Sequence, residues 1–188
     1  MSEFEYATPD PSAGGFPKWI IPVVIVAGIV VGVQQLYYAP KAEKLLMGGL
    51  IAEEAQTLAD SVGRYKQQYG VLPLGGSNDD TALASEGLLL RTLFGLDSEQ
   101  NPKETRFYVP SANAAMWGGF IRDEDTNDVV LKDPWGKPFV VVIDYDGDGQ
   151  VEHPGTKKIF DEEVIVFSKG EDPASHDDDI GSWQSTAP

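Results

Sequence analysis

The residues best suited to chemistry in this sequence are carboxylates, and a first group of them alternates along the chain. Asp144, Asp146 and Asp148 are followed by Gly149 at the sixth position of the run. Alternating carboxylates let their oxygens converge on a hard cation such as Ca²⁺, while the glycine permits a sharp turn. The twelfth position is Gly155 instead of a bidentate glutamate, so the run is not an EF-hand. We therefore predict a calcium loop of a related Asp-rich kind, with a solvated hairpin turn as the alternative.

A second acidic group lies near the C-terminus. Residues 171–179 hold five carboxylates, which repel one another unless a cation or water screens them. Ile180 and Trp183 follow, and these apolar side chains would tie the segment to the body of the protein. An acidic segment that is tied down favours ion binding. The alternative is a solvated acidic C-terminus.

Composition narrows the classes of partner. Among 188 residues, 30 Asp and Glu stand against 14 Lys and Arg, giving a formal net charge of -16. Such a surface repels nucleic acid, so we expect no nucleic-acid partner. The chain has no cysteine, which excludes disulfides, cysteine-ligated metals and cysteine nucleophiles.

We expect no enzymatic activity and no small-molecule substrate. The carboxylates cluster in turns, where they have no evident partner for acid and base work. The two histidines, His153 and His176, have no serine or cysteine nucleophile that the sequence places beside them. His153 precedes a proline, and we interpret it as a loop residue.

The elements that must position these clusters begin with an apolar N-terminal run. After a leader-like segment, residues 1–18, the run from Trp19 to Val33 carries no charge, and it reaches about 20 residues if it extends through Tyr38. We predict a transmembrane helix over residues 19–38. A secretory signal peptide and a buried core helix are the alternatives, although the leader is acidic where a signal peptide is basic. Counted by the positive-inside rule, the few lysines that flank the run weakly favour a cytoplasmic C-terminal domain.

Residues 39–70 continue this helix in amphipathic form. Apolar residues recur at alternating steps of four and three, which places them on one face. Gly70 and Pro73 predict the helix end. Pairing in a coiled coil is an alternative use of the same stripe. The stripe consists of Ile51, Ala55, Leu58, Val62, Tyr65 and Tyr69, and the polar residues predicted to lie off it are Glu53, Glu54, Asp60, Arg64, Lys66 and Gln67.

Residues 71–188 read as a globular β domain. Short apolar runs at 139–143 and 164–167 predict buried strands, and 129–131 predicts a third. A loop and a short helix are expected within 76–97, and the glycine- and acid-rich stretch 111–132 reads as irregular. The fold class predicted is α+β: a long N-terminal helix, transmembrane in its first half, packed on a small antiparallel β-sheet.

Three motifs in this order resemble those of type II secretion major pseudopilins, within the type IV pilin-like family. Residues 133–139 read DPWGKPF and resemble the DPWG-x-P-[YF] signature. Residues 167–183, which begin FSKGED and end DDDIGSW, resemble the FSLGADG…DDADIGNW tail. Residues 65–73, YKQQYGVLP, resemble the Y-x-x-x-x-G-x-[YL]-P helix exit. The likeness runs from the apolar helix to Trp183, with an insertion-like region near 76–128.

The resemblance implies a pilin-like fold and a structural subunit, either in a homo-oligomer or with other pseudopilins and secretion-machinery proteins. It places the chain in the inner membrane, in contact with lipid, with a single span and a periplasmic C-terminal domain. This topology conflicts with the lysine count. The resemblance also implies a calcium site in the last loop. Its ligands would be side-chain oxygens of Asp172 and of Asp177 or Asp179, with carbonyls near Lys169 and Ser175. The family has an acidic residue where His176 stands.

The N-terminus departs from the family pattern. Gly15 and Phe16 stand at the position of the prepilin cleavage site, but Pro17 follows, and the glutamate that the family carries shortly after the cleavage site is missing. Two functions therefore remain open. One is a calcium-stabilised structural subunit of a type II secretion or type IV pilus-like assembly. The other is a membrane-anchored, calcium-dependent binding or assembly protein that has the fold and does not polymerise.

Overall fold

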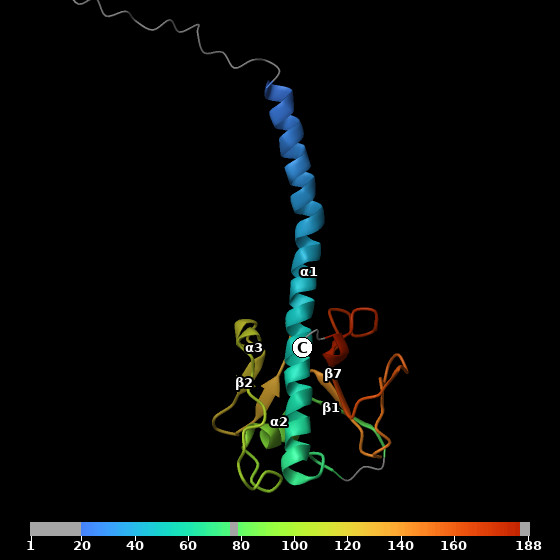
Figure 1. The fold of residues 1–188 in the computed structure, drawn as a ribbon. Helices are drawn as coiled ribbons and strands as arrows, with labels where there is room; N and C mark the ends of the chain where they lie inside the picture. Colours follow the sequence, from blue (N-terminus) through green and yellow to red (C-terminus); the bar gives the residue numbers. More distant parts are fainter. Residues whose placement is uncertain (1–19, 76–78, 185–188) are drawn as a thin grey trace, which may run out of the picture. The chain divides into compact units, whose positions relative to one another are not determined.

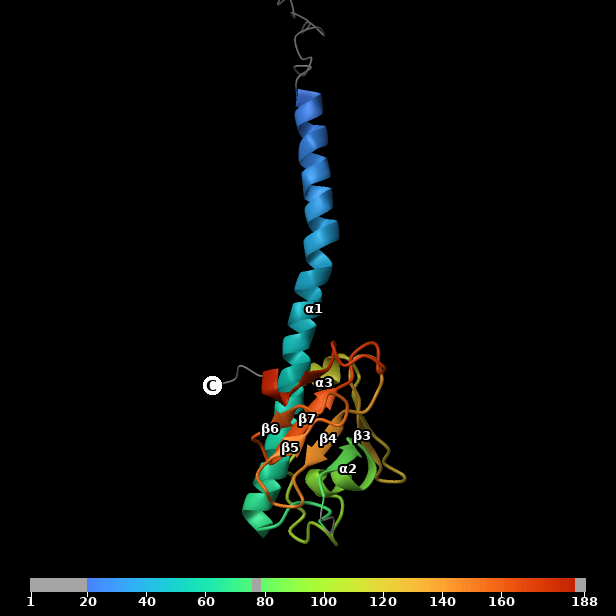
Figure 2. The same cartoon turned by 90° about the vertical axis from the view of Figure 1, so that its right-hand side faces the viewer.

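The computed structural model describes residues 20–75 and 79–184, with side chains described from Lys44 onward. Helix α1, Ile20–Tyr69, runs for 50 residues. Internal contacts divide the chain into one unit up to Lys44 and a second from Leu45 onward. The second unit, drawn in Figures 1 and 2, contains the sheet and every residue analysed below. Its elements after α1 are β1 (Thr81–Ala84), α2 (Gly87–Phe94), α3 (Ala112–Met116), β2 (Phe120–Arg122), β3 (Val129–Leu131), β4 (Val140–Ile143), β5 (Val151–Glu152), β6 (Ile159–Phe160), β7 (Val164–Ser168), β8 (Ile180–Gly181) and the 3-10 helix η1 (Ser182–Gln184).

The second unit is α+β with a small antiparallel sheet. Four strands pair in the order β1-β4-β7-β8, and β2-β3 and β5-β6 form separate two-stranded sheets. Each neighbouring pair in the main sheet is antiparallel, with Val142 opposite both Ala82 and Ile165. The views of Figures 1 and 2 agree that β4 and β7 lie beside the C-terminal part of α1.

The two faces of the sheet bury different residues, because side chains alternate along each strand. Val141, Ile143 and Val166 join the main core with α1 and α2. Val142, Ile165 and Phe167 point the other way and form a second cluster, which Phe160 and Trp183 cover. The sheet is thus buried on both faces. The helical face is covered by the apolar stripe, in which Ile51, Ala55, Leu58 and Val62 are fully buried, Tyr65 is buried and Tyr69 is half-buried.

The predicted fold class needs a correction, because the structure does not show the transmembrane first half of the long helix. Among the residues whose side chains are described, 44–75 and 79–184, no helix is long and apolar enough to cross a membrane. Where the side chains of α1 are described, the helix carries charges such as Glu53, Glu54 and Asp60, and each charge is costly in a bilayer. Among the described side chains of α1, those from Met47 to Tyr69 contribute to the core of the second unit.

The C-terminal region is more ordered than the sequence predicts. Residues 111–132 were expected to be irregular and instead form α3 and the β2-β3 hairpin, with Phe120 opposite Leu131. The Ser111 side chain begins α3 by accepting a hydrogen bond from the Ala114 amide. Strand β1 was also missed, because its sequence, TALA, is short and weakly apolar. The helix end was predicted correctly. Gly70 adopts a φ of 76°, and its amide donates a hydrogen bond to the Lys66 carbonyl.

Candidate metal centre

The first acidic loop closes around one buried carboxylate. Asp144 directly follows β4 and is 3% exposed. Its Oδ1 accepts a hydrogen bond of 2.6 Å from the Gly147 amide, and its Oδ2 accepts one of 2.9 Å from the Gly149 amide. Both glycines have φ near 80°, a region that other residues adopt only with strain. The loop therefore has the sharp turn that the glycine spacing predicted.

These amide contacts keep Asp144 ionised. Burial alone raises the pKa of the Asp144 carboxyl, because it penalises the charged form. The hydrogen bonds from the Gly147 and Gly149 amides outweigh burial, so the pKa of Asp144 lies below its ordinary value. A carboxylate fixed in its charged form by backbone donors is a suitable ligand for a hard cation.

A third carboxylate joins this loop from a distant part of the chain. Asp80 precedes β1, and the pairing of Thr81 with Ile143 sets it across from Asp144. One Asp80 oxygen accepts a hydrogen bond from the Glu152 amide, at 3.2 Å. The other, Oδ1, is buried and has no hydrogen-bond partner among the described residues. In the part of the chain that the structure describes, Asp80, Asp144 and Asp146 form the one group of at least three acidic or histidine side chains whose ligand atoms lie within 4.8 Å of one another.

The negative charges of the triad of Asp80, Asp144 and Asp146 repel one another. The pKa of Asp80 is raised, first by burial and then by the negative charges of Asp146, Asp144 and Asp148, although the Glu152 amide acts in the opposite direction. Converging oxygens, mutual repulsion and one unpartnered buried oxygen are the features that a divalent cation would relieve. These oxygens therefore fit Ca²⁺, and no softer ligand takes part.

The structure brings together only part of the predicted first site. Asp144 and Asp146 belong to the triad, whereas Asp148 is exposed and its carboxylate accepts a hydrogen bond from the Gln150 amide. Asp80 was not predicted. The only sequence signal for it is an acidic residue just before a short strand, and that signal has no meaning until the partner strand is known.

The predicted ligands of the tail loop, residues 169–179, do not converge. Asp172 and Asp177 are exposed, and no group of three tail carboxylates meets within the described residues. The Asp172 carboxylate instead caps its own turn by accepting a hydrogen bond from the Ala174 amide. The Ser175 hydroxyl accepts a hydrogen bond from the Asp177 amide. Lys169 was predicted to contribute a carbonyl, and no contact of the described residues gives it that role.

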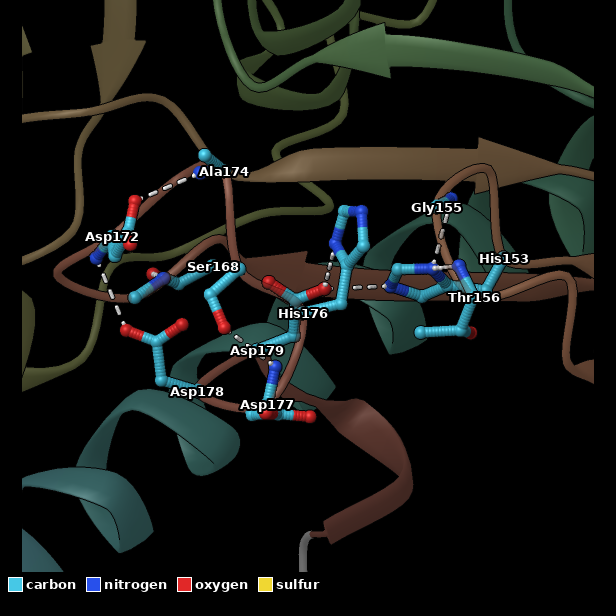
Figure 3. Close-up of polar contacts among 12 residues, drawn as sticks. His153, Gly155, Thr156, Ser168, Asp172, Ala174, His176, Asp177, Asp178 and Asp179 are labelled. Atoms are coloured by element: carbon cyan, nitrogen blue, oxygen red, sulfur yellow. Dashed lines mark hydrogen bonds and ion pairs between the residues drawn. The ribbon is translucent and has the colours of Figure 1, made fainter.

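Asp179 is turned toward two histidines (Figure 3). Its Oδ2 lies 3.0 Å from His176 Nδ1 and 3.2 Å from His153 Nε2. The second is a close contact that lacks the alignment of a hydrogen bond. His153 lies in the loop between β5 and β6, as the sequence predicted, but it is only 2% exposed. Its Nδ1 accepts hydrogen bonds from the amides of Gly155 and Thr156, which leaves the ring proton on Nε2, facing Asp179.

Burial lowers the pKa of His153, and the neighbouring Asp179 opposes this only in part. His153 is therefore held in its neutral form. A neutral imidazole whose Nδ1 accepts two amide hydrogens presents an N–H at Nε2 and no lone pair. Its N–H lies near the Asp179 carboxylate, and the ring is a poor metal ligand in this orientation.

The DPWG segment and the tail motif meet at Asp133, which is 2% exposed. Its Oδ1 accepts hydrogen bonds from the amides of Trp135 and Lys137, at 3.0 and 2.9 Å. Its Oδ2 accepts the Ser168 hydroxyl at 2.6 Å. Gly136 completes the turn with a φ of 79°. The buried carboxylate thus ties a tight turn to the last residue of β7, where the tail loop begins.

The predicted processing residues, Gly15 and Phe16, lie outside the described residues. No protein-family model, curated protein or solved structure matches the chain. The resemblance to pseudopilins therefore stays a prediction, and the function has to be argued from the contacts of this chain alone.

Proposed function

We propose that this chain is a pseudopilin-like structural subunit of a type II secretion or type IV pilus-like assembly at the inner membrane, with a calcium-stabilised periplasmic domain. The observation that carries the proposal is the hydrogen bond between Asp133 and Ser168. These residues belong to two of the three motifs that resemble the family, and they lie 35 positions apart in the chain. Their direct contact supports a shared architecture, since unrelated matches would have no reason to meet in a buried site.

The surroundings of the third motif support the same proposal. Tyr65 and Tyr69 at the helix exit pack their rings against Phe107, with centroids 5.4 and 6.0 Å apart. After the exit, the Pro73 carbonyl accepts a hydrogen bond from the Tyr145 hydroxyl at 2.7 Å. The exit is thereby joined to the loop of the acidic triad. All three motifs thus have structural roles around one sheet, which is a reason to propose a scaffold protein and not an enzyme.

A structural subunit needs surfaces that bind other subunits. Leu45 and Leu46 are neighbours on α1 and are 77% and 72% exposed, so they present adjacent apolar side chains to a partner. We propose that they contact further copies of this chain or other pseudopilins in the assembly.

The assembly is testable with the full-length chain. Sedimentation velocity should show species that grow with protein concentration, and negative-stain electron microscopy should show short fibres. Replacing Leu45 and Leu46 together by aspartate should shift the distribution to monomer, because it places charges in an apolar contact. Ile159→Asp is the matched control, because Ile159 is also exposed, at 58%, but lies on the β5-β6 hairpin.

A strictly monomeric wild-type chain at every concentration would contradict the proposal. It would favour the second candidate, a calcium-dependent binding or assembly protein that does not polymerise. The specific observation behind that candidate is the sequence after Phe16, where proline, lysine and tryptophan stand and the family glutamate is missing.

Calcium is proposed to bind at the triad of Asp80, Asp144 and Asp146. Adding calcium to the wild-type chain should raise its melting temperature, and an excess of about 100 times the Kd corresponds to about 2.7 kcal/mol of stabilisation. The Asp80→Asn and Asp146→Asn double variant should lose this response. In chelator it should be no less stable than wild type, because the substitutions remove repulsion around Asp80. Differential scanning calorimetry with calcium and with chelator measures both effects.

The matched control for this site carries Asp172→Asn and Asp177→Asn. It removes the same number of carboxylates from the exposed tail, and it should keep the full calcium response. If the control loses the calcium response and the triad variant keeps it, the calcium site lies in the tail. No response in either protein would remove calcium from the proposed function.

A further inference from the structure

The tail loop is the position at which the family resemblance implies a metal ion, and its side chains do not fit one. Of the three predicted side-chain ligands, Asp172 and Asp177 are exposed and apart, and Asp179 has its Oδ2 against two imidazoles. Ca²⁺ binds six to eight oxygens, and histidine nitrogen is not among its usual ligands. The loop is nevertheless fixed against the sheet, so other groups must hold it.

One such group is the contact of Asp179 with His153 and His176, here called the His–Asp–His clasp (Figure 3). It joins two segments that are far apart in sequence, the β5-β6 turn and the tail loop. His176 lies so close to Gly155 that a Cβ built there would come within 2.2 Å of the His176 ring. His153 is packed from behind by Phe167, with ring centroids 4.2 Å apart, so its position is rigid.

A protein cation supplies the second contact. The Lys137 ammonium donates to the Glu171 carbonyl at 3.1 Å and to the Gly170 carbonyl at 3.5 Å. Lys137 belongs to the turn that Asp133 fixes, so its ammonium is anchored from outside the loop. A positive charge on two loop carbonyls does electrostatically what a bound cation would do there.

The loop also closes on itself through Asp178. The Asp178 Oδ2 accepts a hydrogen bond from the Asp172 amide at 3.1 Å, as Figure 3 shows. Gly170 lets this carboxylate approach, since a Cβ at Gly170 would come within 2.5 Å of the same oxygen. The remaining oxygens, Asp178 Oδ1 and Asp179 Oδ1, are buried with no hydrogen-bond partner among the described residues. Two carboxylate oxygens are fewer than the six to eight oxygens that Ca²⁺ binds, and the test therefore compares the loop with and without calcium.

We infer that the tail loop is held without a metal, by the His–Asp–His clasp and the Lys137 ammonium in place of the calcium ion that the family resemblance implies. The inference rests on the proposed function, because that proposal supplies the comparison with the family. It assigns calcium dependence to the triad loop alone. The domain would then keep its tail in place when calcium is withdrawn, while the triad loop loosens.

Amide hydrogen exchange of the full-length chain tests this loop directly, because it reports opening residue by residue. Exchange of the amides of residues 172 and 174–177 should be the same in calcium and in chelator. Lys137→Met should speed their exchange by about tenfold in both conditions, since it removes a charge-assisted contact. Lys169→Met is the matched control: it removes a lysine ammonium of the same loop that forms no contact among the described residues, and it should change nothing.

His176→Ala tests the clasp. The side chain is about a third exposed, 37%, so its loss should leave the sheet intact. Amides of β4 and β7 serve as the internal measure of folding, and they should keep their protection while the tail exchanges about tenfold faster. Exchange at Thr156 should rise as well, because that segment packs on His176 through Gly155.

Two results would overturn the inference. One is a tail loop whose exchange slows about tenfold or more when calcium is added, which would place an ion there. The other is a tail unaffected by both Lys137→Met and His176→Ala. Failure of the proposed function gives a different result. If amide exchange in the triad loop, residues 144–149, does not change with calcium, calcium is removed from the proposed function. The inference of a metal-free tail would still be supported by the Lys137→Met and His176→Ala results.

Discussion

Replacing Asp133 by alanine should lower the free energy of unfolding by about 3–5 kcal/mol, one of the two largest losses expected in this chain. The carboxylate is buried and accepts three hydrogen bonds, from the Trp135 amide, the Lys137 amide and the Ser168 hydroxyl. Alanine leaves all three donors without an acceptor in a site that water does not reach. Urea denaturation at 25 °C, followed by circular dichroism, measures the change.

Asp123→Ala is the matched control for this prediction. The Asp123 carboxylate also accepts two amide hydrogen bonds in a turn, from Asp125 and Thr126, but it is exposed. Water replaces those bonds when the side chain is removed, so the loss should be far smaller. Equal losses in the two variants would mean that burial of Asp133, and with it the contact between the two motifs, contributes little to stability.

Tyr108→Phe should cost about 2–4 kcal/mol, because it deprives a buried charge of its main donor. Glu54 was predicted to lie off the apolar stripe, and its side chain is nevertheless fully buried. The Tyr108 hydroxyl donates to Glu54 Oε1, and the Ser111 amide donates to Oε2 at 3.2 Å. Burial, reinforced by the Glu54 carboxylate, raises the pKa of Tyr108, so the hydroxyl keeps its proton and remains a donor.

A double-mutant cycle separates the charge from the loss of the hydroxyl itself. In a Glu54→Gln background the same Tyr108→Phe change should cost about 1–2 kcal/mol less, since a neutral amide tolerates the missing donor better. Tyr145→Phe serves as control, because the Tyr145 hydroxyl donates to the neutral Pro73 carbonyl in a half-buried site, and about 1 kcal/mol is expected there. If Tyr108→Phe costs no more than this control, Glu54 does not depend on Tyr108.

The sequence was sufficient for the elements whose side chains repeat along the chain. The stripe from Ile51 to Tyr65 is buried as its spacing predicts, since a helix places every third or fourth residue on one face. The runs at 139–143 and 164–167 became the central strands β4 and β7 for the related reason that unbroken apolar runs suit a sheet covered on both faces. The glycines of the first acidic loop also predicted its turn, because φ above zero is a local demand.

The membrane-spanning prediction concerns residues that precede the first described side chain, Lys44. It was drawn from residues 19–38, and within the described chain no helix meets the length and apolarity that a bilayer requires. The helix that packs on the sheet is described from Lys44, where charged residues alternate with the apolar stripe. The apolar run and the amphipathic stripe are thus separate signals, and only the second can be compared with side-chain contacts.

What the sequence determined by itself was periodic and local: one amphipathic helix face, two central strands and the turn of the first acidic loop. Only the tertiary structure decided which charged groups meet. Asp80 reaches Asp144 because β1 pairs with β4, and His153 reaches Asp179 because the β5-β6 hairpin folds against the tail. Glu54 lies off the stripe by its spacing and is buried because the segment around Tyr108 covers it. Each contact joins residues from 26 to more than 50 positions apart, and a pattern read over one or two turns carries no information about such pairs.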